Sequence, residues 1–175
     1  MRMSEQLAMI NRFRRTAPVD VETLSQALGV PVHYAFLDPD ISGMLEKIGD
    51  DKFKITVNAQ HPKTRQRFTI AHELGHYMLH RRLIGNGIDE TRAYRSAVAG
   101  VYRNTAIGPV QETEANKFAV NVLMPLDLIQ KYQRESGVNS PAQIARHFGV
   151  SEQSMCIRLG VPYEPEQYHF PMTAG

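Results

Sequence analysis

The sequence predicts an α+β fold, with a small antiparallel sheet packed beside a central helix and a helical C-terminal part. Three short segments rich in strand-forming residues lie close together, at residues 31–37, 43–49 and 53–59. The apolar stretch at residues 63–81 follows them and has helical spacing on more than one face, so this helix is expected to be buried nearly all round. The periodic segments in the second half of the chain have helical spacing, so we expect that part to be helical.

Local signals mark the ends of these elements. Two helices are expected before the sheet, at residues 4–15 and 20–28, and Asp20 is a candidate N-cap of the second. Asp50 and Asp51 can form a hairpin turn between the second and third strands. Beyond the central helix we expect helices at residues 111–124, 125–135, 141–148 and 152–159.

The stretch of residues 85–110 is the least regular part of the chain. Its four glycines, its proline and its tyrosines and arginines predict a long loop, with a short helix near residues 91–98. We therefore expect a main domain at residues 1–135, helix-turn-helix-like C-terminal helices at residues 136–160 packed on it, and a loosely packed tail at residues 161–175.

Composition limits the classes of protein to which the chain can belong. Lys and Arg total 20 against 18 Asp and Glu, and this balance neither demands nor excludes a nucleic-acid partner. Cys156 is the only cysteine, which excludes an internal disulfide and a cysteine-rich zinc site and suits a reducing compartment. The chain has no run of about 18 apolar residues and no apolar signal-peptide core, so we expect a cytoplasmic protein with no membrane association.

The central helix carries the sharpest functional pattern, H-E-x-x-H at His72, Glu73 and His76. Residues four apart share one face of a helix, so both imidazoles can point at one cation, and zinc accepts such nitrogen ligands. Glu73 can then act as the general base that takes a proton from a metal-activated water. The alternative is a pair of ordinary, partly buried histidines. We favour the metal site because the surrounding helix is apolar, and buried imidazoles need partners.

Gly75 lies on the same stripe as the two histidines, together with Phe68, Ala71 and Leu79. A glycine inside a helix costs about 1 kcal/mol relative to alanine. A packing reason is therefore expected, namely that another backbone passes close to the metal.

A zinc site needs a further ligand, which is expected from the segment QETEANKFAVNVLMP. Glu112 and Glu114 are both candidates, and each could instead be a solvated acid at a helix N-terminus. Glu112 is favoured because it aligns with an inward face, and Asn116 one turn later would reach an imidazole N–H. His80 lies two turns beyond His72, too far along the helix to be a ligand, so we expect a surface or packing role for it.

The two motifs together, RQRFTIAHELGHYMLH and ETEANKFAVNVLMP, resemble the ImmA/IrrE family of metallopeptidases. The resemblance runs in order from about Val19 to Arg158, and it implies a zincin-like fold of the gluzincin type, with Glu73 as the catalytic residue. The Zn²⁺ ligands that it implies are His72, His76 and Glu112. The spacer between the motifs is long here, which leaves the structure of residues 85–110 open but not the ligands.

The resemblance also implies a function. Members of the family cleave helix-turn-helix repressors inside the cell, and some are encoded beside such a regulator in arrangements that resemble toxin–antitoxin pairs. We therefore expect a zinc endopeptidase that acts on an intracellular repressor or antitoxin. The alternative is a DNA-binding or toxin-like regulatory protein with a structural metal and no turnover. IrrE-type members carry a further sensory domain, which is not expected here.

Residues 141–159, PAQIARHFGVSEQSMCIRL, resemble a helix-turn-helix. Phosphate contacts dominate affinity for DNA, and here Arg146, His147 and Arg158 are the only sources of positive charge. We therefore expect these helices to pack on the rest of the chain or to dock a protein, and a nucleic-acid partner is not expected.

Overall fold

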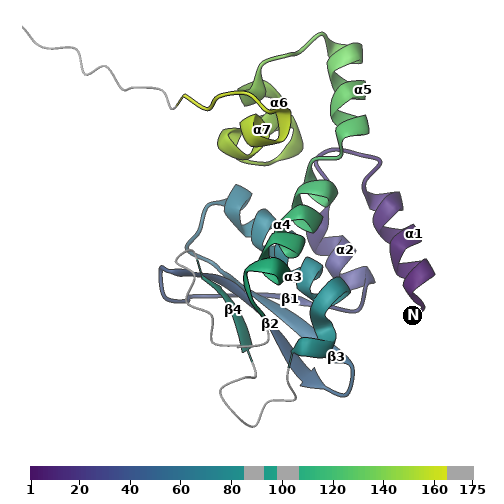
Figure 1. The fold of residues 1–175 in the computed structure, drawn as a ribbon, viewed down its shortest axis with the longest axis vertical. Coiled ribbons are helices and arrows are strands. Elements are labelled where there is room, and N and C mark those ends of the chain that lie inside the picture. Colours follow the sequence, from purple (N-terminus) through teal and green to yellow (C-terminus); the bar gives the residue numbers. More distant parts are fainter. Residues whose placement is uncertain (85–92, 98–106, 165–175) are drawn as a thin grey trace, which may run out of the picture.

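The computed structural model describes residues 1–84, 93–97 and 107–164, and of residues 93–97 it describes the backbone. Figure 1 shows a sheet at one end of the molecule, helices lying across it, and the C-terminal helices at the opposite end. This arrangement confirms the expected α+β class. In the described part of the chain, no helix combines the length and apolarity that crossing a bilayer requires.

The sheet has the strand order β1-β3-β2-β4. Its strands are β1 (Val32–Ala35), β2 (Ile41–Gly49), β3 (Lys52–Asn58) and β4 (Ala93–Ala97). Asp51, with φ 55°, makes the expected turn between β2 and β3, in the left-handed conformation that such turns need. β2 pairs antiparallel with β3 and with β4, but β1 pairs in parallel with β3. The sheet is therefore mixed and not wholly antiparallel. Strand β3 folds back from β2 and lies between β1 and β2, which run in opposite directions.

The prediction of a short helix near residues 91–98 is wrong for the part of this stretch that the structure describes. Residues 93–97 form β4, which pairs with the free side of β2. An uncovered strand edge offers unpaired N–H and C=O groups, and ladder hydrogen bonds to that edge outweigh local helix preference. The remainder of the expected loop, at residues 85–92 and 98–106, lies outside the described residues.

The helices follow the sequence signals closely. The two before the sheet are α1 (Met3–Phe13) and α2 (Val21–Ala27). Asp20 is the N-cap of α2, as expected, and its Oδ1 accepts a hydrogen bond from the Thr23 N–H at 3.0 Å. The others are α3 (Lys63–His80), the 3₁₀ turn η1 (Arg81–Leu83), α4 (Pro109–Leu123), α5 (Leu126–Ser136), α6 (Pro141–Phe148) and α7 (Glu152–Leu159).

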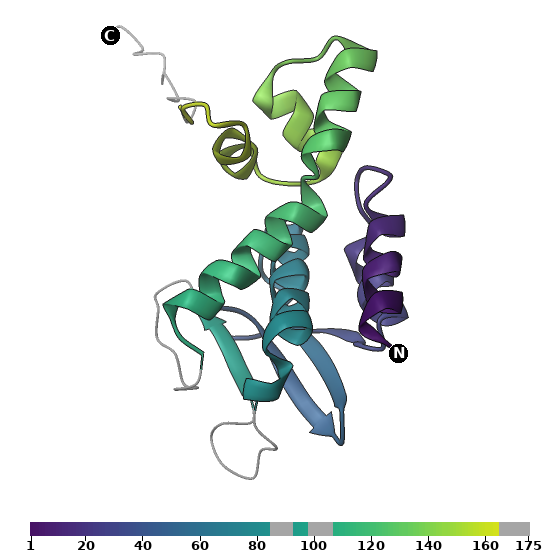
Figure 2. The same cartoon turned by 45° about the vertical axis from the view of Figure 1, so that its right-hand side comes forward.

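Helix α3 is the central element of the fold. It is buried at every residue from Thr69 to Met78, whereas Leu79 departs from its expected stripe and is 54% exposed. Figures 1 and 2 both show α4 lying against α3. Buried residues of α2, the sheet, α3, α4, α6 and α7 belong to one hydrophobic core.

Two arginines join the C-terminal helices to α3 and α4. Arg67 of α3 donates through Nε to the carbonyl of Gly149 and through Nη2 to that of Val19, both at 2.9 Å. Arg158 of α7 donates through Nε to the carbonyl of Met124 at 2.9 Å. Helices α6 and α7 are therefore held to the ends of both helices that carry the candidate site.

Candidate metal centre

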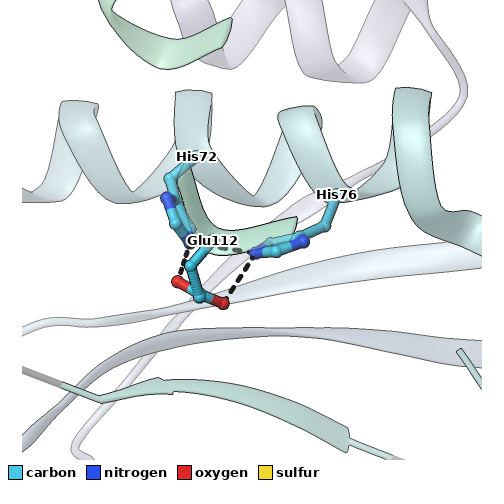
Figure 3. A group of neighbouring side chains, drawn as sticks. All are labelled: His72, His76 and Glu112. Atoms are coloured by element: carbon cyan, nitrogen blue, oxygen red, sulfur yellow. Dashed lines mark hydrogen bonds and ion pairs between the residues drawn. The ribbon is translucent and has the colours of Figure 1, made fainter. Parts of the chain in front are cut away.

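The two histidines of the H-E-x-x-H pattern lie one turn apart on α3 and face the same point. The Nε2 atoms of His72 and His76 are 3.0 Å apart, and Figure 3 shows both rings turned to the same side of the helix. His72 is 5% exposed and His76 is fully buried. The pair is thus shielded from solvent on a rigid element.

Helix α4 reaches this point because it crosses α3 at Gly75. A Cβ added to Gly75 would lie 3.0 Å from the Cα of Ala115, 3.1 Å from its carbonyl oxygen and 3.2 Å from the Cβ of Phe118. Carbon atoms normally approach to about 3.5–4.0 Å, so glycine is needed at this crossing. The expected close passage of a second backbone is confirmed. It sets Glu112, one turn before Ala115, beside the histidines.

Glu112 completes a group of three side chains that could hold a metal ion. Its Oε2 lies 3.3 Å from the Nε2 of His72, and its Oε1 lies 3.2 Å from the Nε2 of His76 (Figure 3). Donors bonded to a tetrahedral zinc ion at about 2.0–2.1 Å are separated by roughly 3.3 Å. The observed separations therefore suit such an ion, and two imidazoles with one carboxylate form a donor set that catalytic zinc uses.

Glu112 and Glu73 have different electrostatic environments. Burial raises the pKa of Glu112, but the neighbouring imidazoles of His72 and His76 outweigh this effect and lower it to about 2. Glu112 is therefore an ionised carboxylate, the form that binds a cation.

Glu73, next to His72, lies in the opposite situation. It is fully buried, and within the described residues neither carboxylate oxygen has a hydrogen-bond partner. Burial raises its pKa to about 8, the charge of Glu112 adds to this effect, and His72 opposes it. A buried carboxyl without a hydrogen-bond partner is destabilising, and a group with a strongly shifted pKa in such a place is a candidate functional residue.

The outer atoms of both histidines also have partners. The Nδ1 of His72 lies 2.9 Å from the Oδ1 of Asn116, the residue that was expected to reach an imidazole N–H. His80 is not at the surface as one expectation had it, because it is 6% exposed and its Nδ1 lies 3.1 Å from the Nδ1 of His76. The Nε2 of His80 lies 2.9 Å from the Oε2 of Glu114, so Glu114 contacts His80 and stands outside the three-residue group.

The contact between His80 and His76 has a signal in the sequence, namely the spacing of the histidines along α3. Measured from His72, His80 is two turns away, but measured from His76 it stands at the same four-residue spacing that joins His72 to His76.

Comparisons with known proteins agree with this description. The Peptidase_M78 family model, described as the IrrE N-terminal-like domain, matches residues 25–160, a range that contains the whole centre. A solved structure of a Mycobacterium tuberculosis transcriptional regulator is similar, with a TM-score of 0.58 and 19% identity over 92% of this chain and 48% of that chain. This likeness shows a shared fold, and the chain spans about half the length of that regulator. No curated protein matches the chain.

Proposed function

Because the chain belongs to the Peptidase_M78 family of IrrE N-terminal-like domains, we propose that it is a zinc-dependent endopeptidase that hydrolyses a peptide bond in an intracellular protein. The observation that carries the proposal is the convergence of His72, His76 and Glu112 beside a buried glutamate with no hydrogen-bond partner among the described residues. A site built only for stability would leave no such carboxyl next to the donors.

The residues of the centre have separate roles in this proposal. The ligands are His72, His76 and Glu112. Bound zinc would polarise the scissile carbonyl, acidify the attacking water and favour the ionised form of Glu73. Glu73 takes the proton of that water and delivers it to the leaving amine, as a general base and then a general acid. Asn116 Oδ1 would accept the Nδ1–H of His72, which would leave the lone pair of Nε2 available for the metal.

The proposed substrate is a helix-turn-helix repressor or antitoxin encoded nearby, by resemblance to the ImmA/IrrE family. A protein partner agrees with the exposed side of α7, where Ile157 is 73% exposed. Large exposed apolar side chains are more useful for contacts with protein than with phosphate. The single cysteine agrees with a reducing compartment, so we place the protein in the cytoplasm.

The alternative function is a DNA-binding or toxin-like regulator whose metal is structural and which has no turnover. The name of the similar solved structure, a transcriptional regulator, favours it. The guanidinium of Arg158, the best placed cation of α7, is instead hydrogen bonded to Met124 and to the Oδ1 of Asn121. This engagement leaves α7 with little charge for a DNA backbone, and we rank the peptidase first.

The experiment that tests the proposal compares zinc content and turnover. Wild type and Glu73→Gln should each bind one zinc ion per chain, and His72→Ala should lose it. Cleavage of the purified repressor encoded beside the gene should fall at least about 100-fold in Glu73→Gln. Glu135→Gln, which changes an exposed carboxyl of α5, is the matched control and should cleave at the wild-type rate. Equal cleavage by Glu73→Gln would refute the assignment.

A further inference from the structure

We propose that His80 and Glu114 form a positioning pair that orients His76 toward the metal. The inference rests on the proposed zinc site, but it concerns two residues outside the ligand set. His80 comes from the last turn of α3 and Glu114 from the first turns of α4, so the pair joins the two helices that also supply the ligands.

The contacts form a continuous line from the ligand to solvent. His76 is fully buried, and its Nδ1 lies 3.1 Å from the Nδ1 of His80. His80 is 6% exposed, and its Nε2 lies 2.9 Å from the Oε2 of Glu114. The side chain of Glu114 is about half exposed, at 51%. The line thus begins at a buried ligand and ends at a carboxylate in contact with water.

Metal binding through Nε2 of His76 would favour one arrangement of protons along this line. The Nε2 atom must present a lone pair to the ion, so the proton of neutral His76 resides on Nδ1. The Nδ1–H of His76 then donates to the Nδ1 of His80. This atom must accept, so the proton of His80 resides on Nε2 and donates to the carboxylate of Glu114. Each nitrogen and the carboxylate have complementary partners.

The same line explains why a histidine occupies this buried position. An apolar side chain would fill the space without the cost of burying a polar ring, so packing alone favours leucine. Histidine adds an acceptor at Nδ1, and Glu114 holds its ring by a charge-assisted hydrogen bond. The two ligands of α3 are thus supported in different ways, since His72 contacts Asn116 directly and His76 contacts Glu114 through His80.

The test compares two substitutions of similar shape at His80. In His80→Leu the acceptor is lost, whereas in His80→Asn the Oδ1 can accept the hydrogen bond near the position of Nδ1. Zinc affinity, measured by competition with a chromogenic chelator, should fall about 10- to 100-fold in His80→Leu and by less in His80→Asn. In the metal-free proteins, the unfolding temperature should be higher for His80→Leu than for His80→Asn, because burying leucine costs less than burying asparagine.

A second pair of variants tests whether Glu114 acts through His80. Glu114→Gln changes a half-exposed side chain and should weaken zinc binding on its own. It should have no further effect when His80 is already replaced by leucine, since its contact is then absent. Glu135→Gln is the control for removal of a helical carboxylate and should leave zinc affinity unchanged. The d–d absorption bands of the Co²⁺-loaded protein should shift in His80→Leu and remain as in wild type in Glu135→Gln.

The possible results separate this inference from the proposed function. If both His80 variants bind zinc as tightly as wild type, or if their affinities follow their stabilities, the positioning role is refuted. Failure of both His80 variants to fold leaves the decision to Glu114→Gln, whose unchanged affinity would refute it. A wild-type protein that binds zinc without cleaving any repressor overturns only the peptidase assignment. A wild-type protein that binds no zinc overturns both.

Discussion

The crossing of α3 and α4 predicts the effect of replacing Gly75 by alanine. The added Cβ would lie 3.0 Å from the Cα of Ala115, where about 3.5–4.0 Å is normal, so α4 must move away by roughly half an ångström. The carboxylate of Glu112, one turn away, moves with it. Zinc–ligand distances vary by only about 0.2 Å, so we expect zinc affinity to fall about tenfold or more. Overpacking costs about 1–3 kcal/mol and alanine restores about 1 kcal/mol of helix propensity, so the metal-free protein should lose about 0–2 kcal/mol.

Two measurements check this prediction. Competition with a chelator gives the zinc affinity, and urea unfolding in excess chelator gives the stability of the metal-free protein. Gly49→Ala is the matched control, because its Cβ would meet the Cδ of Lys52 at an ordinary 3.7 Å, and it should bind zinc like wild type. A Gly75→Ala protein with wild-type zinc affinity would show that the helix crossing does not set the position of Glu112.

Three further predictions follow from other contacts. Arg67→Met leaves the carbonyls of Gly149 and Val19 without this partner, and it should lower the free energy of unfolding by about 3 kcal/mol in urea titrations. Arg82→Met, at an exposed site, is the control, and an equal loss in both variants would contradict the prediction. Hydrogen bonds from Thr23 lower the pKa of Asp20, so its stabilisation is present above the pKa of the unfolded carboxyl and is lost as the pH falls through the lower folded value. Asp20→Asn should therefore show a weaker loss of stability as the pH falls below about 4, the pKa of an unfolded aspartate. An unchanged pH dependence of stability in acid would disprove the contribution of the cap. Chelation should remove about 2.7 kcal/mol of stability relative to free Zn²⁺ at 100 times Kd yet leave helical circular dichroism intact, whereas a random-coil spectrum would mean that the core depends on the metal.

Most helices of the fold could be predicted because their signals are local. Asp20 caps α2 through a residue three positions away, and Pro125 separates α4 from α5 within a single turn. The histidines of α3 were equally accessible, since a four-residue spacing on a helix determines that His72 and His76 share a face. Such inferences need only neighbours along the chain.

The features that escaped prediction depend on contacts between distant segments. The parallel pairing of β1 with β3 follows from the order in which strands assemble, which their alternation of side chains does not specify. β4 forms because an edge of β2 is open to it, although its own residues do not alternate clearly. The contact between His80 and Glu114 depends on where α4 crosses α3, and Gly75 indicates a close crossing without indicating its angle.

The hydrogen bonds of Arg67 and Arg158 set a limit on how far the protein can be shortened. A version that stops at residue 135 keeps every donor atom of the centre, but it removes the Gly149 carbonyl from Arg67 and removes Arg158 from the end of α4. Helices α3 and α4 would then lose the hydrogen bonds that join them to α6 and α7, although their direct packing at Gly75 would remain. A shortened version that keeps both of these hydrogen bonds therefore extends through Gly160, where α7 ends.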